Sequence, residues 1–230
     1  MLQTYIIKGN CSVSNYTFTI PEIKLPEEFG VWIDKNSTDQ LNQMQQFLGT
    51  TSYFPQGHGD KRYENGPFAV ELAHHEYIKV IREWVKDTFT VKVANVFHVR
   101  TAPRKNGLWH CEGPALSNRR VTFNFLVRGE VGNTGSQWGI NPDWTDTVNP
   151  LDESAERNGQ LNTEDQSKIQ VVDEITNDTM HECFAYNTTF LHRSINEHSD
   201  TERVLLSVTL PEMYSIELIR KMHNEGKLIK

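Results

Sequence analysis

Cysteine is scarce in this chain, which has three such residues, Cys11, Cys111 and Cys183, among 230. Because their number is odd, they lie far apart and no two form a CxxC pair, the sequence favours neither a disulfide framework nor a zinc ribbon. Long apolar runs are also missing, and no window approaches the length of a membrane-spanning helix. The first residues do not combine a basic segment with a long apolar one, so we expect no secretory signal and a cytoplasmic protein.

An excess of basic residues is absent as well. The chain has 23 Lys and Arg residues against 30 Asp and Glu residues, which gives a formal net charge of -7. This balance disfavours nucleic acid or an anionic membrane as a partner. The hydrophobic content of 37% and the charged content of 23% are those of an ordinary globular protein. No internal repeat or linker divides the sequence, so we expect a single domain over residues 1–230.

Helical spacing of apolar residues appears twice in the N-terminal part of the chain. The first segment covers residues 37–48, and the second and clearer one runs from Pro67 to about Asp87, with proline in the favoured first turn. Two β-like runs, Thr4–Lys8 and Tyr16–Ile20, precede these segments. We expect residues 1–92 to supply strands and supporting helices.

Short runs of β-branched and aromatic residues dominate the rest of the sequence. The clearest is Arg120–Arg128, which Gly129 ends. Residues 129–168 are rich in Gly, Asn, Asp and Ser, so we expect a long loop that carries Trp138 and Trp144 and forms a lid or substrate wall. The other strand-like runs are Val91–Val99, Trp109–Glu112, Ile169–Ile175, Cys183–Tyr186, Thr189–His192 and Arg203–Leu210.

Many short strands separated by turn signals indicate a β-sandwich or barrel. We expect a β-rich core over residues 93–211, interrupted by the long insert 129–168. Residues 212–230 follow Pro211 and include an amphipathic segment, Tyr214–Asn224, that is typical of a closing helix.

The sequence Trp109-His110-Cys111-Glu112-Gly113 carries the first chemical signal. In a strand, residues i and i+2 point to the same face, so His110 and Glu112 can present an imidazole and a carboxylate together. His192, in another predicted strand, is the candidate third ligand. Two histidines and one carboxylate form the facial triad that suits non-haem iron(II) and leaves coordination positions open.

A basic residue follows these candidate ligands along the chain. Arg203 lies eleven residues after His192 and begins the next strand-like run. Its planar guanidinium is suited to binding a carboxylate through two hydrogen bonds. Ser207, four residues on, shares the strand face of Arg203 and can add a hydroxyl donor.

At these residues the chain resembles the iron(II)- and 2-oxoglutarate-dependent oxygenases, which have a His-x-Asp/Glu pair, a distal His and a following Arg or Lys. The resemblance covers roughly residues 93–211 and is closest to the aspartyl/asparaginyl β-hydroxylase-like and prolyl-hydroxylase-like branches, between which we do not choose. It implies a mainly β fold with flanking helices: a double-stranded β-helix, also called a jelly roll and similar to the cupins, supported by N-terminal helices. The chain departs from the commonest pattern in having Glu112 where most members have Asp, an arginine spacing longer by one, and a long segment between Glu112 and His192.

The resemblance also implies the cofactors and the roles of the site residues. Fe(II) would bind to His110, Glu112 and His192, and 2-oxoglutarate would bind the metal while Arg203 holds its distal carboxylate. With O2 as the oxidant, a small-molecule or peptide substrate would be hydroxylated as succinate and CO2 are released. Besides Ser207, Asn124 is a candidate contact for the cosubstrate.

Two further side chains are candidates for contact with the substrate, and each has a simpler explanation. Arg119 can bind an acidic substrate or form an ordinary salt bridge. Trp138 can stack on the substrate or fix the long loop.

Other histidines compete with the proposed ligands. His181 is an alternative third ligand that lacks the strand context of His192, His98 can line the pocket or make a hydrogen bond in the core, and His58 belongs to a glycine-rich loop.

Two other functions stay open at this point. One is a cupin-like metal-binding jelly roll of different chemistry, in which Arg203 is structural. The other is a metal-free jelly-roll binding module that uses its tryptophan-rich loop as the working surface.

Overall fold

The computed structural model describes residues 14, 16–35, 68–71, 76–107, 109–110, 119–142 and 167–230. For residues 68–71, 76–78, 97, 119 and 120 it describes the backbone only. Several residues and segments singled out above lie outside the described residues: Thr4–Lys8, Cys11, residues 37–48, His58, Cys111, Glu112 and Trp144.

Six antiparallel strands form the larger of two sheets, in the order β1-β7-β4-β9-β3-β2. β4 pairs with β7 on one side and β9 on the other, which brings Phe125 opposite both Cys183 and Leu206. The strands are β1 (Thr17–Lys24), β2 (Phe68–Glu71), β3 (Asn95–Thr101), β4 (Arg119–Arg128), β7 (Glu182–Asn187) and β9 (Arg203–Pro211).

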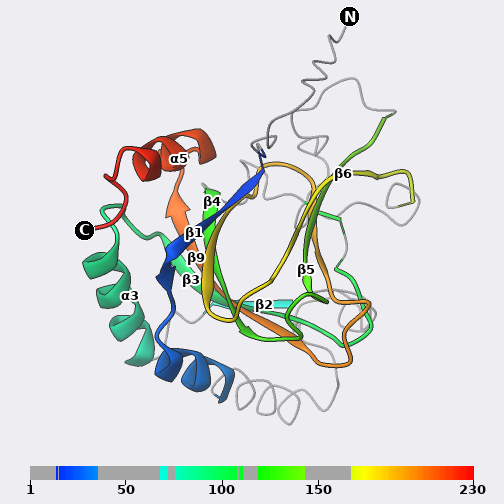
Figure 1. Ribbon diagram of the computed structural model, residues 1–230, viewed down its shortest axis with the longest axis horizontal. Coiled ribbons are helices and arrows are strands. Elements are labelled where there is room, and N and C mark those ends of the chain that lie inside the picture. Colours follow the sequence, from blue (N-terminus) through cyan, green and yellow to red (C-terminus); the bar gives the residue numbers. More distant parts are fainter. Residues whose placement is uncertain are drawn as a thin grey trace, which may run out of the picture.

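Three antiparallel strands, β5 (Gly135–Ile140), β6 (Gln170–Thr176) and β8 (His192–Ile195), form the smaller sheet in the order β6-β5-β8. His110 extends this sheet through a single antiparallel bridge to His192. From β3 onwards the chain crosses repeatedly between the two sheets, so that β4, β7 and β9 return to the large sheet after visits to the small one (Figure 1). This is the double-stranded β-helix that the family resemblance implies.

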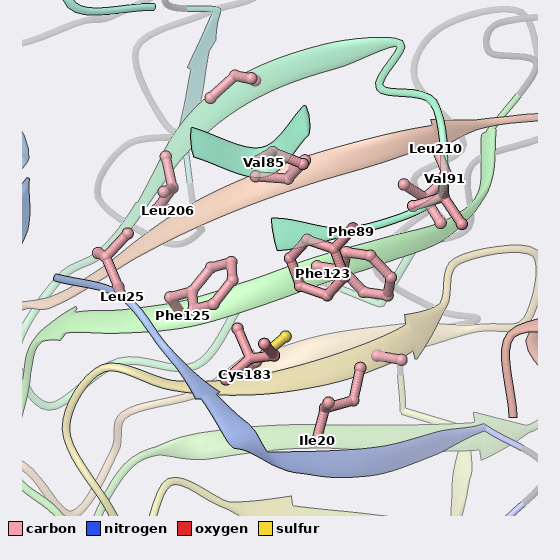
Figure 2. Packing of buried hydrophobic residues seen from close by; sticks show 14 of the residues in the cluster. Ile20, Leu25, Val85, Phe89, Val91, Phe123, Phe125, Cys183, Leu206 and Leu210 are labelled. Atoms are coloured by element: carbon pink, nitrogen blue, oxygen red, sulfur yellow. The ribbon is translucent and has the colours of Figure 1, made fainter. Parts of the chain in front are cut away.

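The helices lie over the outer face of the large sheet (Figure 1). Those within the described residues are the helix at 27–35, α3 (Glu76–Thr88) and α5 (Ile216–Asn224). Ser215 caps α5 by accepting a hydrogen bond from the backbone N–H of Leu218. Apolar side chains of these helices meet those of β1, β4, β7 and β9 in one buried cluster, and Figure 2 shows Val85 of α3 among them. Of the helices that the structure describes, none has the length and apolar character needed to span a membrane.

The strands of the large sheet divide their side chains between two cores. Val204 and Leu206 of β9 belong to the cluster under the helices, whereas Leu205 belongs to a second cluster with Trp138 of the small sheet. Because side chains alternate along a strand, Arg203 faces the same way as Leu205, into the space between the sheets. Polar residues therefore enter the barrel interior from the same strands that build the helix-covered core.

The run Thr189–His192, predicted as a strand, is one only from its last residue, which begins β8, and two segments predicted as helix or loop are strands. Residues 68–71 form strand β2, which pairs with β3 from Phe68↔Arg100 to Glu71↔Phe97, and the helix begins only at Glu76. Residues 135–140, predicted as part of a long loop, form the central strand of the small sheet. In both places, pairing with a neighbouring strand outweighs local sequence preference.

Candidate functional site

His110 and His192 lie side by side on adjacent chain segments. The backbone N–H of His110 donates to the carbonyl of His192 at 3.0 Å, and the reciprocal bond is 2.8 Å. Their ring centroids are 4.4 Å apart, with the ring planes inclined at 51°. Residues that face each other across two strands present their side chains on the same face of the sheet, so this pairing can offer two imidazoles to one ion.

The segment that carries His110 is held in place by the residue before it. Trp109 is buried, and its ring lies against Gly139 of β5, where an added Cβ would meet the indole at 2.9 Å and Ile169 at 2.2 Å. On the same ring, the guanidinium carbon of Arg193 lies 4.7 Å from the centroid, a cation–π contact. The small residue in β5 thus gives the indole room, and the indole fixes the position of the neighbouring histidine.

The hydrogen bond of His192 selects its tautomer. Its Nδ1 lies 2.8 Å from the carbonyl oxygen of Phe190 and donates to it, which leaves the lone pair on Nε2. Burial, together with the nearby His110, lowers the pKa of His192 to about 3, so the ring is neutral at physiological pH. A neutral imidazole whose other nitrogen is tied to a backbone carbonyl is the usual state of a metal-binding histidine. The histidine pair therefore fits a metal ion.

Arg203 reaches across the interior from the first position of β9. Its side chain is 1% exposed. Nε and Nη2 donate to Asn177 Oδ1 at 3.3 and 3.2 Å, and Nη2 also approaches Ser136 Oγ at 3.2 Å and the Tyr186 hydroxyl at 3.5 Å. The guanidinium thus touches the small sheet at β5 and the large sheet at β7.

Within the described part of the chain, Arg203 makes hydrogen bonds to uncharged groups, and these bonds are long. Desolvation by burial lowers the pKa of Arg203, while Tyr186 acts in the opposite direction. A guanidinium nevertheless stays protonated in proteins. A buried cation without a charged partner is costly, and an anionic ligand at this position would offset that cost.

The strand register relates this cation to the histidine pair. Ser136 of β5 is paired with Ser194 of β8, and Trp138 is paired with His192. The Ser136 contact of Arg203 and the position of His192 are therefore separated by two residues along the sheet, roughly 7 Å. A five-carbon dicarboxylate is about that long, so one end of it can reach Arg203 while the other lies beside His192.

Asn124 and Ser207 face each other on β4 and β9, on the interior side of the large sheet. The Ser207 hydroxyl donates to Asn124 Oδ1, and both residues are buried. Because the amide oxygen of Asn124 already accepts this hydrogen bond, its amide NH2 is the group that can donate to a ligand in the interior. Both residues face the interior, as does Arg203, but the hydroxyl of Ser207 is directed at Asn124.

The remaining predicted site residues are placed as follows. Trp138 is fully buried in β5, donates from Nε1 to the carbonyl of Asn187 at 3.1 Å and packs edge-on against Tyr186. Its ring is therefore part of the barrel packing and not of a loop. Arg119 is the first residue of β4, described by its backbone alone. Glu112 lies outside the described residues, within which no group of three or more His, Cys, Asp or Glu residues could hold a metal.

Two of the competing histidines, His181 and His98, are described by the structure and lie apart from this pair in the fold. The ring of His181 is packed against Gly30 in the helix at 27–35. His98 lies on β3 opposite Leu206, on the helix-covered face of the large sheet.

Three residues around Arg203 were not predicted from the sequence: Ser136, Asn177 and Tyr186. Tyr186 stands in a strand-like run at an interior-facing position, a polar signal that was readable. Ser136 lies in a segment whose composition predicts a loop. Nothing local marks Asn177, which follows β6 and accepts a hydrogen bond from Arg203 only because of the way the sheets pack.

No family model matches the sequence, and no match was found among curated proteins. Solved structures do match. The carbocyclase SnoK from nogalamycin biosynthesis, a non-heme alpha ketoglutarate dependent enzyme, matches with a TM-score of 0.51 and 12% identity, over 86% of this chain and 80% of that one. HygX from Streptomyces hygroscopicus, with nickel and 2-oxoglutarate bound, matches with a TM-score of 0.49 and 11% identity, over 87% and 85%. At such low identity the likeness to SnoK shows the fold, and the chain has the double-stranded β-helix fold of that enzyme.

Proposed function

We propose that this protein is a non-haem iron(II)- and 2-oxoglutarate-dependent oxygenase that hydroxylates a small molecule or a peptide side chain. In the reaction, 2-oxoglutarate, O2 and a substrate C–H bond give succinate, CO2 and the hydroxylated substrate. SnoK, which shares the fold, is itself described as alpha ketoglutarate dependent, and this agrees with the proposal.

One observation carries the proposal: a buried arginine with uncharged partners lies about one dicarboxylate length from two adjacent histidines, inside the same barrel. The distal carboxylate of 2-oxoglutarate would pair with Arg203 and gain charge-assisted hydrogen bonds. Ser136 and Tyr186, which already touch Arg203, would orient the guanidinium. The keto-acid end would then lie beside His110 and His192.

His110 and His192 would hold the iron together with Glu112. When bound, iron(II) supplies the redox chemistry that couples decarboxylation of 2-oxoglutarate to oxidation of the substrate. The protein's own contribution is to keep His192 neutral, to fix the spacing of the two histidines through two backbone hydrogen bonds, and to hold the cosubstrate in a buried interior that excludes bulk water.

Anaerobic titration of the metal-free protein with Fe(II) and then 2-oxoglutarate tests this proposal. We expect the weak visible charge-transfer band of an iron–2-oxoglutarate chelate in the wild type. His110→Ala should abolish the band, and Arg203→Gln should require about a hundredfold more 2-oxoglutarate, the cost of losing a buried charge-assisted pair. His198→Ala and Arg104→Gln are matched controls, because both side chains are largely exposed, and they should behave like the wild type.

The other outcomes favour the two alternatives. Iron that binds without any band on addition of 2-oxoglutarate contradicts the proposal and favours a cupin-like metal protein in which Arg203 is structural. Failure to bind iron at all removes the histidine pair as a metal site and favours a metal-free binding module.

A further inference from the structure

An ion cluster lies directly behind the site, on the opposite face of the large sheet. Glu202, the residue before Arg203, accepts hydrogen bonds from Arg100 on both carboxylate oxygens: Nε donates to Oε1 at 2.7 Å, and Nη2 donates to Oε2. Arg128 Nη2 donates to the same Oε2 at 2.7 Å, and Arg128 Nε lies 3.2 Å from Asp34 Oδ1 in the helix at 27–35. Arg100 is 3% exposed and Glu202 18%, whereas Arg128 and Asp34 are partly exposed, so the Arg100–Glu202 pair is the part of the cluster that is shielded from water.

The register shows why Glu202 and Arg203 serve different faces. Val204 is paired with Arg100 on β3 and with Arg128 on β4, and Val204 packs into the core under the helices. Glu202 meets both arginines on that side. Because consecutive residues of a strand point to opposite faces, Arg203 is directed into the barrel interior.

The charged groups are divided between the two faces of the sheet in the same way as the side chains. Two guanidinium groups bind the carboxylate of Glu202, so the acidic group next to Arg203 in the chain is engaged on the other face of the sheet. Asn196 fixes the same turn from inside: its amide NH2 donates to the carbonyls of Ala102 and Thr201, both at 2.9 Å. The turn therefore joins the His192 strand to the Arg203 strand with little freedom.

We propose that Glu202, clamped between Arg100 and Arg128, is the positioning residue for Arg203: it fixes the start of β9 from the helix-covered face and leaves the charge of Arg203 available to an anionic ligand. This inference rests on the proposed function for the identity of that ligand, but the positioning itself does not depend on it.

The test compares Glu202→Gln with two controls. In iron-loaded protein without oxygen, we expect the Kd for 2-oxoglutarate to rise about tenfold in Glu202→Gln, while the Kd for Fe(II) changes less than twofold. Asp200→Asn breaks an exposed ion pair of the same turn and should change neither constant. Leu206→Ala opens a cavity in the helix-side core of the same strand and lowers stability while leaving the clamp intact, so it should also leave both constants near the wild-type values.

A second readout follows Arg203 itself and needs neither metal nor 2-oxoglutarate. The Nε–H signal of Arg203 in a nitrogen-15 NMR spectrum, assigned by its loss in Arg203→Lys, should exchange slowly in the wild type and at least tenfold faster in Glu202→Gln. If Glu202→Gln does not fold, Arg128→Gln can replace it, because it removes one of the two arginines that bind Glu202 at a partly exposed position. We expect it to raise the Kd for 2-oxoglutarate and the exchange rate of the Arg203 Nε–H about threefold.

Equal weakening of 2-oxoglutarate binding by Leu206→Ala and Glu202→Gln overturns the positioning role, because the effect would then follow stability alone. An unchanged Arg203 signal in Glu202→Gln overturns it as well. A wild type that shows the slow Arg203 signal and its loss in Glu202→Gln, yet binds no 2-oxoglutarate, supports the positioning role and rejects the proposed function.

Discussion

At the scale of single residues, the absence of a side chain at position 139 matters as much as the side chains of the site. Gly139 lets the Trp109 ring lie on β5, and Trp109 adjoins His110. We expect Gly139→Ala to lower the free energy of unfolding by about 1–3 kcal/mol, because the new methyl must displace a buried indole or the stiff side chain of Ile169. We also expect weaker Fe(II) binding, since moving Trp109 moves its neighbour.

Urea unfolding and Fe(II) titration of the same samples check this prediction. Gly226→Ala is the control, because its φ of 64° strains any other residue while its surroundings are open. That control should lose stability by roughly 1–2 kcal/mol, the cost of a left-handed conformation, and bind iron normally. Normal iron binding in Gly139→Ala would contradict the coupling between Trp109 and His110.

The positions of the candidate site residues are easier to predict from the sequence than the contacts around them. Arg203 and Ser207 share a strand face by simple alternation, and the structure places both on the interior side of β9. The contacts of Arg203 with Ser136 and Asn177 were not predictable, because they depend on how one sheet packs over the other. Local pattern fixes which face a residue takes, whereas the partner across the barrel follows from the register of several strands.

At the scale of elements, the difference between local sequence pattern and contacts across the barrel explains which strands are predicted correctly and which are missed. β4 and β9 carry an unbroken row of apolar residues, many of them β-branched or aromatic, on the helix-covered face, as expected of strands that pack in a core. β5 was missed because it contains Gly135, Ser136, Gln137 and Gly139, which have low strand preference. Tertiary contacts require these small residues: a Cβ at Gly135 would lie 2.1 Å from the carbonyl oxygen of Ile175.

The turn that precedes β7 leads to a prediction for how the stability of the protein depends on pH. His181 has a φ of 66°, and its ring packs against Gly30 in the helix at 27–35. Burial lowers its pKa below the ordinary value of 6.5, and the charge of Glu27 opposes this only in part. The unfolded chain therefore takes up the proton first as the pH falls, so we expect stability to be lost progressively below pH 6.5.

His181→Asn tests this assignment, because asparagine tolerates the left-handed conformation and does not titrate. Urea unfolding at a series of pH values from neutral to mildly acidic should show a smaller loss of stability in the variant than in the wild type. Parallel curves for the two proteins would show that His181 is not the titrating group.

At the scale of the whole molecule, the proposed ligands join the two sheets. The histidine pair belongs to the small sheet and Arg203 to the large one, so metal and cosubstrate together would bridge the barrel interior. A ligand that binds only the folded state raises its stability by about 2.7 kcal/mol at a hundred times its Kd. For a chain of this length, that corresponds to an increase in Tm of roughly 5–10 °C.

Thermal unfolding with Mn(II) and N-oxalylglycine, a stable analogue of 2-oxoglutarate, measures this bridging without turnover. We expect Mn(II) alone to raise the Tm of the wild type and the analogue to raise it further by roughly the amount above. In Arg203→Gln the increase in Tm caused by Mn(II) should remain, and the further increase caused by the analogue should nearly vanish, because only the contact with the large sheet is lost. Arg104→Gln, altered at an exposed arginine, should show both increases. If the analogue raises the Tm of Arg203→Gln as much as that of the wild type, the ligand is held by the small sheet alone. That result would contradict the prediction that the ligand bridges the two sheets.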